Sequence, residues 1–307
     1  MQYSVSSAPH IHAKANTAVL MLDVVTALMP CAIAGIWLFG WAAARVLLIS
    51  IISCVLFELL YQLLAKKPVR INDLSAVVTG LILGLNLPST APWWMIVVGS
   101  LVAIVLVKQL FGGIGDNFVN PALAARAVLL ASWPALMSGA AFVSLFDGVS
   151  GATPLVASEG TFSTLDLLVG RVPGSIGEVC KIAILLGLVY LLIRKTITWH
   201  IPVTMIVSFA VFSWIFKGNI AAVPTELFSG SILFGAVFMA TDYVTSPMTL
   251  GGKFIYAAGT GLIIALIRSF GSYPEGTTYA ILLMNVVTPL LDRVMKHKMY
   301  GEVKGNV

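Results

Sequence analysis

Long apolar stretches alternate with short polar breaks along almost the whole chain. Each stretch is bounded by proline, glycine, asparagine or charged residues. A helix needs about 20 residues to cross a hydrocarbon core of ~30 Å, so the pattern predicts an all-α integral membrane protein with about ten transmembrane helices. We expect these helices at 22–40, 43–65, 71–88, 92–111, 119–139, 176–194, 197–216, 227–242, 251–270 and 276–296.

Composition limits the classes of function. The 307 residues are 59% hydrophobic and 10% charged, whereas soluble domains are roughly 45–50% apolar and about 25% charged. About ten spans would use roughly 200 residues, which leaves no room for a large soluble domain. The net charge of +5 therefore bears on orientation in the membrane, and we expect no nucleic-acid partner.

The positions of lysine and arginine predict the orientation. With the N-terminus inside, most of these residues fall on the cytoplasmic side, which favours both termini inside. The polar N-terminal segment lacks a signal-peptide cleavage pattern and is expected to be retained. The predicted organisation is a cytoplasmic tail at 1–16, a first five-helix repeat at 17–139, an external loop at 140–175, a second five-helix repeat at 176–296 and a cytoplasmic tail at 297–307.

The two halves share a weak internal similarity. Several features recur in the same order: Asp73, Gly80-Leu-Ile-Leu-Gly84, Pro92, Lys108 and Phe111-Gly112 match Glu226, Ser231-Ile-Leu-Phe-Gly235, Pro247, Arg268 and Phe270-Gly271. Because each half has an odd number of spans, the second must enter the membrane with opposite polarity, which predicts an inverted repeat. Chance similarity between apolar segments is the alternative.

Inverted repeats usually contain interrupted helices that line a site near the middle of the membrane. Asn86 and Pro88 interrupt one run of the first half, and Asp242 and Pro247 interrupt the corresponding run of the second. The Gly80-xxx-Gly84 spacing within the first run is typical of a close helix-packing surface. Three cysteines without a C-x-x-C pair and four scattered histidines predict neither a metal site nor a disulfide framework.

The external loop contains the most distinctive polar segment, Asp147-Gly-Val-Ser150-Gly151-Ala152-Thr153-Pro154. Its small residues predict a turn that leaves the hydroxyl group of Thr153 accessible. Asp147 and Ser150 would then be close enough to bind a metal or to orient an incoming group. By composition alone, an ordinary Gly/Ser loop is the simpler interpretation.

The same segment resembles the D-x-x-S-G-A-T motif on which a flavin transferase esterifies the phosphate of FMN to threonine. That motif occurs in the NqrB/RnfD family, the membrane subunits of the Rnf and sodium-pumping NADH:quinone oxidoreductase complexes. The resemblance covers nearly the whole chain. Further segments are similar to signature segments of that family, in its order: Gly112-Gly-Ile-Gly-Asp116-Asn117-Phe-Val-Asn120-Pro121-Ala, Gly174-Ser-Ile-Gly177-Glu178, Met239-Ala-Thr-Asp242-Tyr-Val-Thr-Ser246-Pro247 and Tyr273-Pro-Glu275-Gly276.

The resemblance implies an electron-transfer subunit of a redox-driven complex that translocates Na⁺ or H⁺ across a bacterial cytoplasmic membrane and exchanges electrons between ferredoxin and NAD. Such a subunit is not catalytic alone. Its implied partners are a second flavin subunit, iron–sulfur subunits, membrane lipid and, during maturation, the flavin transferase. The cofactor performs the redox chemistry, and the protein supplies placement and electrostatics.

The implied flavin site on the outer side is the phosphoester of FMN on Thr153, with Asp147, Ser150, Gly151 and Ala152 around it. The phosphate is anionic, and Arg171 or Lys181 on the same side is expected to neutralise it.

The resemblance also implies a second, noncovalent flavin, riboflavin, in the membrane core. Asn117 and Asn120 lie at the head of the fifth predicted span, and Asp242 lies at the break in the eighth. We expect these three side chains to contact that flavin; the alternative is that they only cap broken helices. Other ionisable groups inside predicted spans usually face a cavity or a partner, and here they are Glu58, Asp73, Arg126 and Glu178.

A passive channel or a secondary transporter for a small solute is the rival interpretation, because inverted repeats with broken helices suit it equally. The loop motif separates the two classes. A transporter has no need for an accessible threonine that accepts a phosphoester.

Overall fold

A computed structural model describes residues 16–137, 141–142, 163–271 and 275–295, and all regular secondary structure in these ranges is helical. The all-α prediction is therefore confirmed for the described chain. The first half contains α1 (Thr17–Phe39), α2 (Trp41–Leu64), η1 (Ile71–Asp73), α3 (Ser75–Leu85), α4 (Trp93–Leu101), the π-helical η2 (Val102–Gln109), α5 (Pro121–Ser132) and α6 (Pro134–Met137). The rest contains α7 (Thr164–Val169), α8 (Lys181–Ile193), α9 (His200–Lys217), η4 (Ile220–Ala222), α10 (Val223–Phe228), α11 (Ile232–Phe234), the π-helical η5 (Gly235–Met239), α12 (Leu250–Phe270) and α13 (Thr277–Val294).

Each of the ten predicted apolar ranges contains helix, but the helices differ in length. Among the described residues, four helices are long and apolar enough to cross a membrane, namely α1, α2, α9 and α12. A fifth is reached if Ile220–Phe228 and Ile232–Met239, which meet at a bend of 66°, count as one span. By length and composition, the described part of the chain thus contains four or five candidate membrane spans, and the number ten stays a prediction.

The predicted interruptions account for the short helices. In the first half, α3 ends at Leu85 and α4 begins only at Trp93, so the segment around Asn86 and Pro88 is not helical. In the second half, η5 ends at Met239 and α12 begins at Leu250, on either side of Asp242 and Pro247. Proline lacks the backbone N–H that a helix interior needs, so helices end near it.

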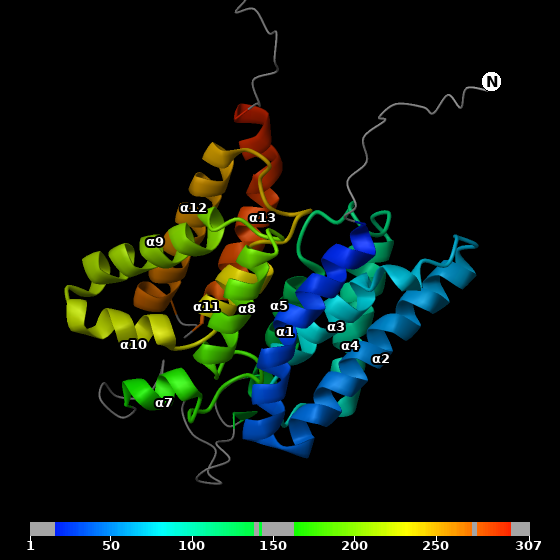
Figure 1. The fold of residues 1–307 in the computed structure, drawn as a ribbon, viewed down its shortest axis with the longest axis horizontal. Helices are drawn as coiled ribbons and strands as arrows, with labels where there is room; N and C mark the ends of the chain where they lie inside the picture. The colour runs from blue at the N-terminus through cyan, green and yellow to red at the C-terminus, as the bar shows by residue number, and fades with distance from the viewer. Residues whose placement is uncertain (1–15, 138–140, 143–162, 272–274, 296–307) are drawn as a thin grey trace, which may run out of the picture.

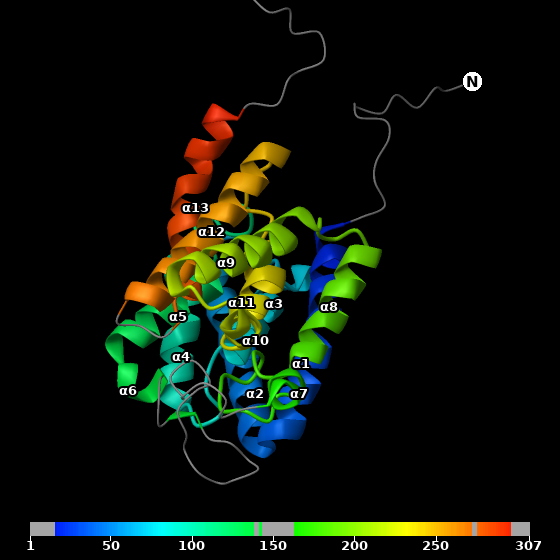
Figure 2. The ribbon, with the colours of Figure 1, turned by 90° about the vertical axis from the view of Figure 1, so that its left-hand side faces the viewer.

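The two halves lie beside each other, with α1–α5 on the right of Figure 1 and α9–α13 on the left. They meet where α1 packs against α8 and where α5 packs against α13. The start of α1 and the end of α13 lie at the upper end of the molecule in Figures 1 and 2, whereas α7 lies at the lower end. The side of the membrane on which the termini lie stays a prediction.

Close packing of α3 on α2 depends on the glycine spacing in α3. A methyl group added at Gly80 would lie 2.8 Å from the Cα atom of Ile51, which leaves no space for a side chain. The hydroxyl group of Ser50 donates a 2.7 Å hydrogen bond to the carbonyl oxygen of Gly80. Gly84 lies against Leu47 of the same helix α2. The expected helix-packing role of this glycine pair is confirmed.

Candidate functional site

A cavity lies where the two halves meet. Its volume is about 100 Å³. Its wall is built from α1, α3, η2, the start of α5 and the segment before it, α8, η5 and the break after η5. Asn117, Asn120 and Asp242, which are far apart in sequence, all line it. The structure thus brings together the three side chains that the sequence assigned to one ligand; their contact with a flavin stays a prediction.

Asn120 has two roles in this wall. Its side-chain oxygen accepts hydrogen bonds from the backbone N–H groups of Ala122 (3.1 Å) and Leu123 (3.3 Å), so it caps the N-terminus of α5. Its amide nitrogen donates to the carbonyl oxygen of Met239, 3.4 Å away at the end of η5. Asn120 therefore caps α5, and the same residue links the two halves at the cavity.

Asn117 and Asp242 are held by bonds to their own segments. The amide nitrogen of Asn117 donates to the carbonyl oxygen of Val119 at 3.0 Å. The carboxylate of Asp242 accepts from the backbone N–H of Val244 (3.5 Å) and from the hydroxyl group of Thr245 (3.2 Å). These bonds fix both side chains in the cavity wall and leave each with further hydrogen-bonding capacity.

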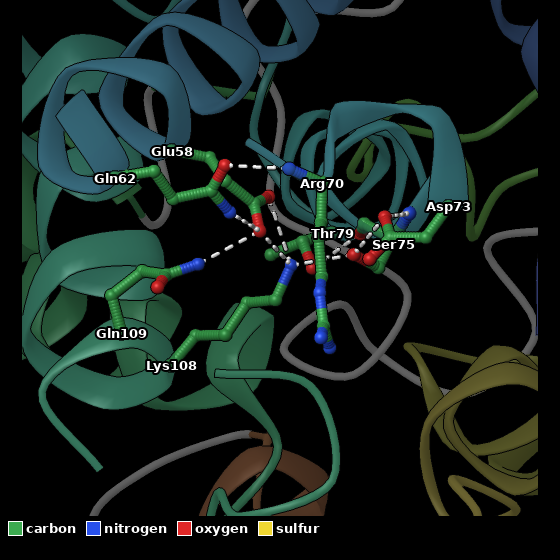
Figure 3. A network of polar contacts seen from close by, with 8 residues as sticks. All are labelled: Glu58, Gln62, Arg70, Asp73, Ser75, Thr79, Lys108 and Gln109. Atoms are coloured by element: carbon green, nitrogen blue, oxygen red, sulfur yellow. Dashed lines mark hydrogen bonds and ion pairs between the residues drawn. The ribbon is translucent and has the colours of Figure 1, made fainter. Parts of the chain in front are cut away.

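A buried polar network lies directly beside the cavity (Figure 3). Glu58 of α2 is its centre: its two carboxylate oxygens accept from the ammonium group of Lys108 at 2.9 Å each. The amide groups of Gln109 (2.8 Å) and Gln62 (3.4 Å) donate to the same carboxylate. The Lys108 ammonium also donates to the hydroxyl group of Ser75 at 2.6 Å. Lys108 and Ser75 belong to the cavity wall, whereas Glu58 lies behind it.

Two further bonds extend the network toward the protein surface. The hydroxyl group of Ser75 donates to Asp73 at 2.6 Å, and the side chain of Gln62 accepts from the backbone N–H of Arg70 at 2.9 Å. The network therefore joins α2, η1, α3 and η2. Buried charges are tolerated only when they are paired and hydrogen-bonded, and here the carboxylate and the ammonium group both meet that condition.

Sequence reasoning found Glu58 but missed the burial of Lys108. Lys108 was not among the ionisable groups expected inside the spans, yet its side chain is only 4% exposed. The internal repeat could have pointed to a structural role for Lys108, because it matches this residue with another cation, Arg268.

A second polar cluster occurs at the corresponding place in the other half. The guanidinium group of Arg268 in α12 donates to the carbonyl oxygens of Glu226 (2.7 Å) and Ser229 (3.2 Å). The carboxylate of Glu226 in α10 accepts from the hydroxyl group of Ser213 in α9 and pairs with Lys217. Arg268 therefore ties α12 to α10, and the carboxylate of Glu226 ties α10 to α9.

A third ion pair joins α5 to the break after α3, to the segment before α13 and to the bend before α11. Arg126 is 4% exposed and lies 2.6 Å from the carboxylate of Glu275, in the segment before α13. Its guanidinium group also donates to the side-chain oxygen of Asn86 at 2.8 Å, and Glu275 accepts from the backbone N–H of Ser231 at 2.7 Å. The sequence identified Arg126 as an intramembrane charge, but not Glu275 as its partner.

The motif residues Asp147, Ser150, Gly151, Ala152 and Thr153 lie outside the described residues. Their predicted roles stay predictions.

The two cations considered for the phosphate differ in exposure. Arg171 carries an exposed side chain. Lys181 is 1% exposed, and its ammonium group donates to the backbone carbonyl oxygens of Glu178 and Gly230. Because Lys181 is enclosed, Arg171 is the better candidate of the two.

Comparison with known proteins identifies the family. The model of the NQR2, RnfD, RnfE family matches residues 4–301 of the chain. The chain belongs to this family. Its match with the D subunit of a Na⁺-translocating ferredoxin:NAD⁺ oxidoreductase complex from Acetobacterium woodii is 49% identical over 99% of the chain and 97% of that protein.

Other relatives support the same assignment. The D subunit of a proton-translocating ferredoxin:NAD⁺ oxidoreductase complex from Clostridium ljungdahlii is 38% identical over 97% of the chain and 96% of its own length. The D subunit of an ion-translocating oxidoreductase complex from Escherichia coli is 35% identical over 99% of the chain and all of its own length. The part matched by the NQR2, RnfD, RnfE family includes the cavity, the Glu58 network and the loop motif.

Proposed function

We propose that this chain is the membrane electron-carrying subunit of an ion-translocating complex that exchanges electrons between ferredoxin and NAD. The observation that carries the proposal is full-length similarity to proteins named as the D subunits of such complexes, at up to 49% identity. The relatives' names include both Na⁺-translocating and proton-translocating complexes, and the proposal covers both ions. The chain acts within a larger assembly in a bacterial cytoplasmic membrane.

The first cofactor we propose is FMN, attached through its phosphate to Thr153. The donor chemistry fits: a threonine hydroxyl group forms a phosphoester, and the flanking small residues of the D-x-x-S-G-A-T motif leave it accessible. Arg171, whose side chain is exposed, is the cation we assign to the phosphate. A covalent tether keeps the cofactor from diffusing away on the outer side of the membrane.

The second cofactor we propose is a noncovalent flavin, riboflavin, in the cavity. The wall offers amide groups from Asn117 and Asn120 and a carboxylate from Asp242, so it presents both donors and acceptors to a polar heterocycle. Apolar residues of α1, α3 and η5 complete the wall. When bound, an isoalloxazine ring supplies one- and two-electron transfer.

We further infer that the chain has ten spans arranged as two inverted five-helix repeats with both termini inside. The two polar clusters support this arrangement: Lys108 bonds to groups of α2 and α3, and Arg268, its match in the repeat, bonds to the carbonyl oxygens of Glu226 and Ser229 at the end of α10. The paired helix breaks and the contacts of α1 with α8 and of α5 with α13 agree with it. Halves of opposite polarity place their broken helices near the same depth of the membrane.

Ultraviolet fluorescence of the denatured protein band tests the covalent flavin. In a host that has the flavin transferase, the proposal expects a fluorescent band for the native chain and for Thr161→Val, a control in the same loop but outside the motif. It expects no fluorescence for Thr153→Val. A dark native band would favour the rival, a channel or secondary transporter.

A further inference from the structure

Two charged side chains, Lys108 and Asp242, contribute to the cavity wall. The carboxylate of Asp242 is bonded to a backbone N–H and to the hydroxyl group of Thr245. Lys108 brings a positive charge to the same cavity from η2. A ligand in this cavity therefore lies near one cationic and one anionic group.

The charge that Lys108 presents depends on a residue behind it. Its ammonium group uses two bonds on Glu58 and one on Ser75. Ser75 belongs to the cavity wall and Glu58 does not. The ammonium group of Lys108 therefore lies between the cavity and the carboxylate of Glu58. Glu58 therefore cancels part of the field of Lys108 at the cavity, and removal of one charge or the other changes that field in opposite directions.

Because the ion pair is buried, removal of either charge is expected to change the electric field in the cavity strongly. Glu58 and Lys108 are at most 4% exposed, and water is largely excluded from the pair. Coulomb interactions in a buried site are several times stronger than in water. Two other charged residues near Glu58 are expected to affect the field in the cavity less. Asp73 is bonded to Ser75 and not to Lys108, and Arg70 contacts the network only through its backbone N–H.

We propose that Lys108 raises the reduction potential of the flavin held in the cavity, and that Glu58 is a positioning residue that limits this effect by pairing with it. The inference rests on the proposed noncovalent flavin. Addition of electrons from a donor raises the negative charge on the ring, so a nearby cation favours the reduced form and a nearby anion opposes it. The same ion pair forms the contact between α2 and η2, so a change of charge on the flavin also acts on that contact.

Charge-changing variants of the full-length chain test the proposal. Each is made in a Thr153→Val background, so that the noncovalent flavin is the only flavin in the protein. The midpoint potential of this flavin is measured by spectroelectrochemical titration in detergent. Glu58→Gln leaves the ammonium group unopposed and is expected to shift the potential to more positive values. Lys108→Met is expected to shift it to more negative values. The double variant is expected to lie near the background chain, because its net charge is again unchanged.

Two comparisons keep the result interpretable. Lys67→Met removes an exposed lysine shortly after the end of α2 and is expected to leave the potential unchanged. If Lys108→Met does not fold, the double variant must lie at a more negative potential than Glu58→Gln. Shifts of the same sign for Glu58→Gln and Lys108→Met, or no shift in either, would overturn the role of Lys108 while leaving the flavin site intact. A background chain that carries no flavin would overturn both this inference and the proposed cavity site.

Discussion

The ammonium nitrogen of Lys108 lies 2.9 Å from both carboxylate oxygens of Glu58, and the two side chains are 4% and 2% exposed. This contact joins α2 to η2, and through Ser75 it reaches α3 as well. The network is therefore both a connection between helices and one wall of the cavity. Because the ion pair is buried, its loss is expected to lower the stability of the protein.

Removal of one partner is expected to destabilise the protein much more than removal of both. Lys108→Met leaves the Glu58 carboxylate buried and unpaired, which costs about 3–5 kcal/mol for a buried pair. The Glu58→Gln/Lys108→Met double variant leaves no buried charge at this pair and is expected to recover most of that loss. Thermal unfolding of the purified chains in detergent measures the difference. Equal destabilisation by the single and double variants would contradict the ion pair as the cause.

Substitution of Asp242 is expected to release the noncovalent flavin. Asp242→Ala removes the carboxylate from the cavity wall, and Asp242→Asn keeps its shape but removes its charge. We expect both to lower the flavin content of a Thr153→Val chain, with the larger loss for alanine. Absorbance of the extracted flavin per mole of protein is the measurement. Asn219→Ala, at an exposed asparagine after α9, is the control. Full retention in Asp242→Ala would exclude Asp242 as a ligand.

The contact between α2 and α3 is expected to tolerate no side chain at Gly80. Gly80→Val would force its side chain against the backbone of Ile51 and Ser50, and overpacking of this kind costs about 1–3 kcal/mol or more. Gly251→Val is the matched control, because its new Cβ atom would meet only the flexible side chain of Met295. A midpoint of thermal unfolding for Gly80→Val equal to that of the native chain would show that the helices lie farther apart than we describe.

The proposed inverted arrangement makes a prediction about sidedness. The end of α2 is expected to face the cytoplasm and the end of α9 the exterior. Lys67→Cys and Asn219→Cys place thiols at these exposed positions, in a Cys180→Ser background because the other two cysteines are buried. An impermeant maleimide applied to intact cells should label Asn219→Cys alone. Labelling of both, or of Lys67→Cys alone, would contradict the arrangement.

Helices and their interruptions could be predicted from the sequence because both depend on local chemistry. Hydrophobicity located the helices, and Pro88 and Pro247 marked the segments where two of them are interrupted. The number of clear spans could not be predicted in the same way. Short helices such as α3 and α5 are stabilised by packing on their neighbours, so their length says little about whether they cross the membrane.

Part of the candidate site could also be predicted. Asn117, Asn120 and Asp242 were identified together through the family resemblance, and the structure places them in one cavity wall. The partners of the buried charges could not be predicted in this way. Lys108 is 50 residues from Glu58 along the chain, and Glu275 is 149 residues from Arg126. Pairing over such separations depends on how the helices fold together. The repeat was the one sequence signal that pointed to Lys108.

The most direct test of the proposed function is the mass of the tryptic peptide that runs from Ala127 to Arg171 and contains Thr153. It should be isolated from the mature protein of the natural host and compared with the Thr153→Val peptide from the same host. We expect a mass increase of one FMN less one water on the native peptide, located at Thr153, and none on the variant. A native peptide of unmodified mass would contradict the proposal that this chain carries electrons on a covalent flavin.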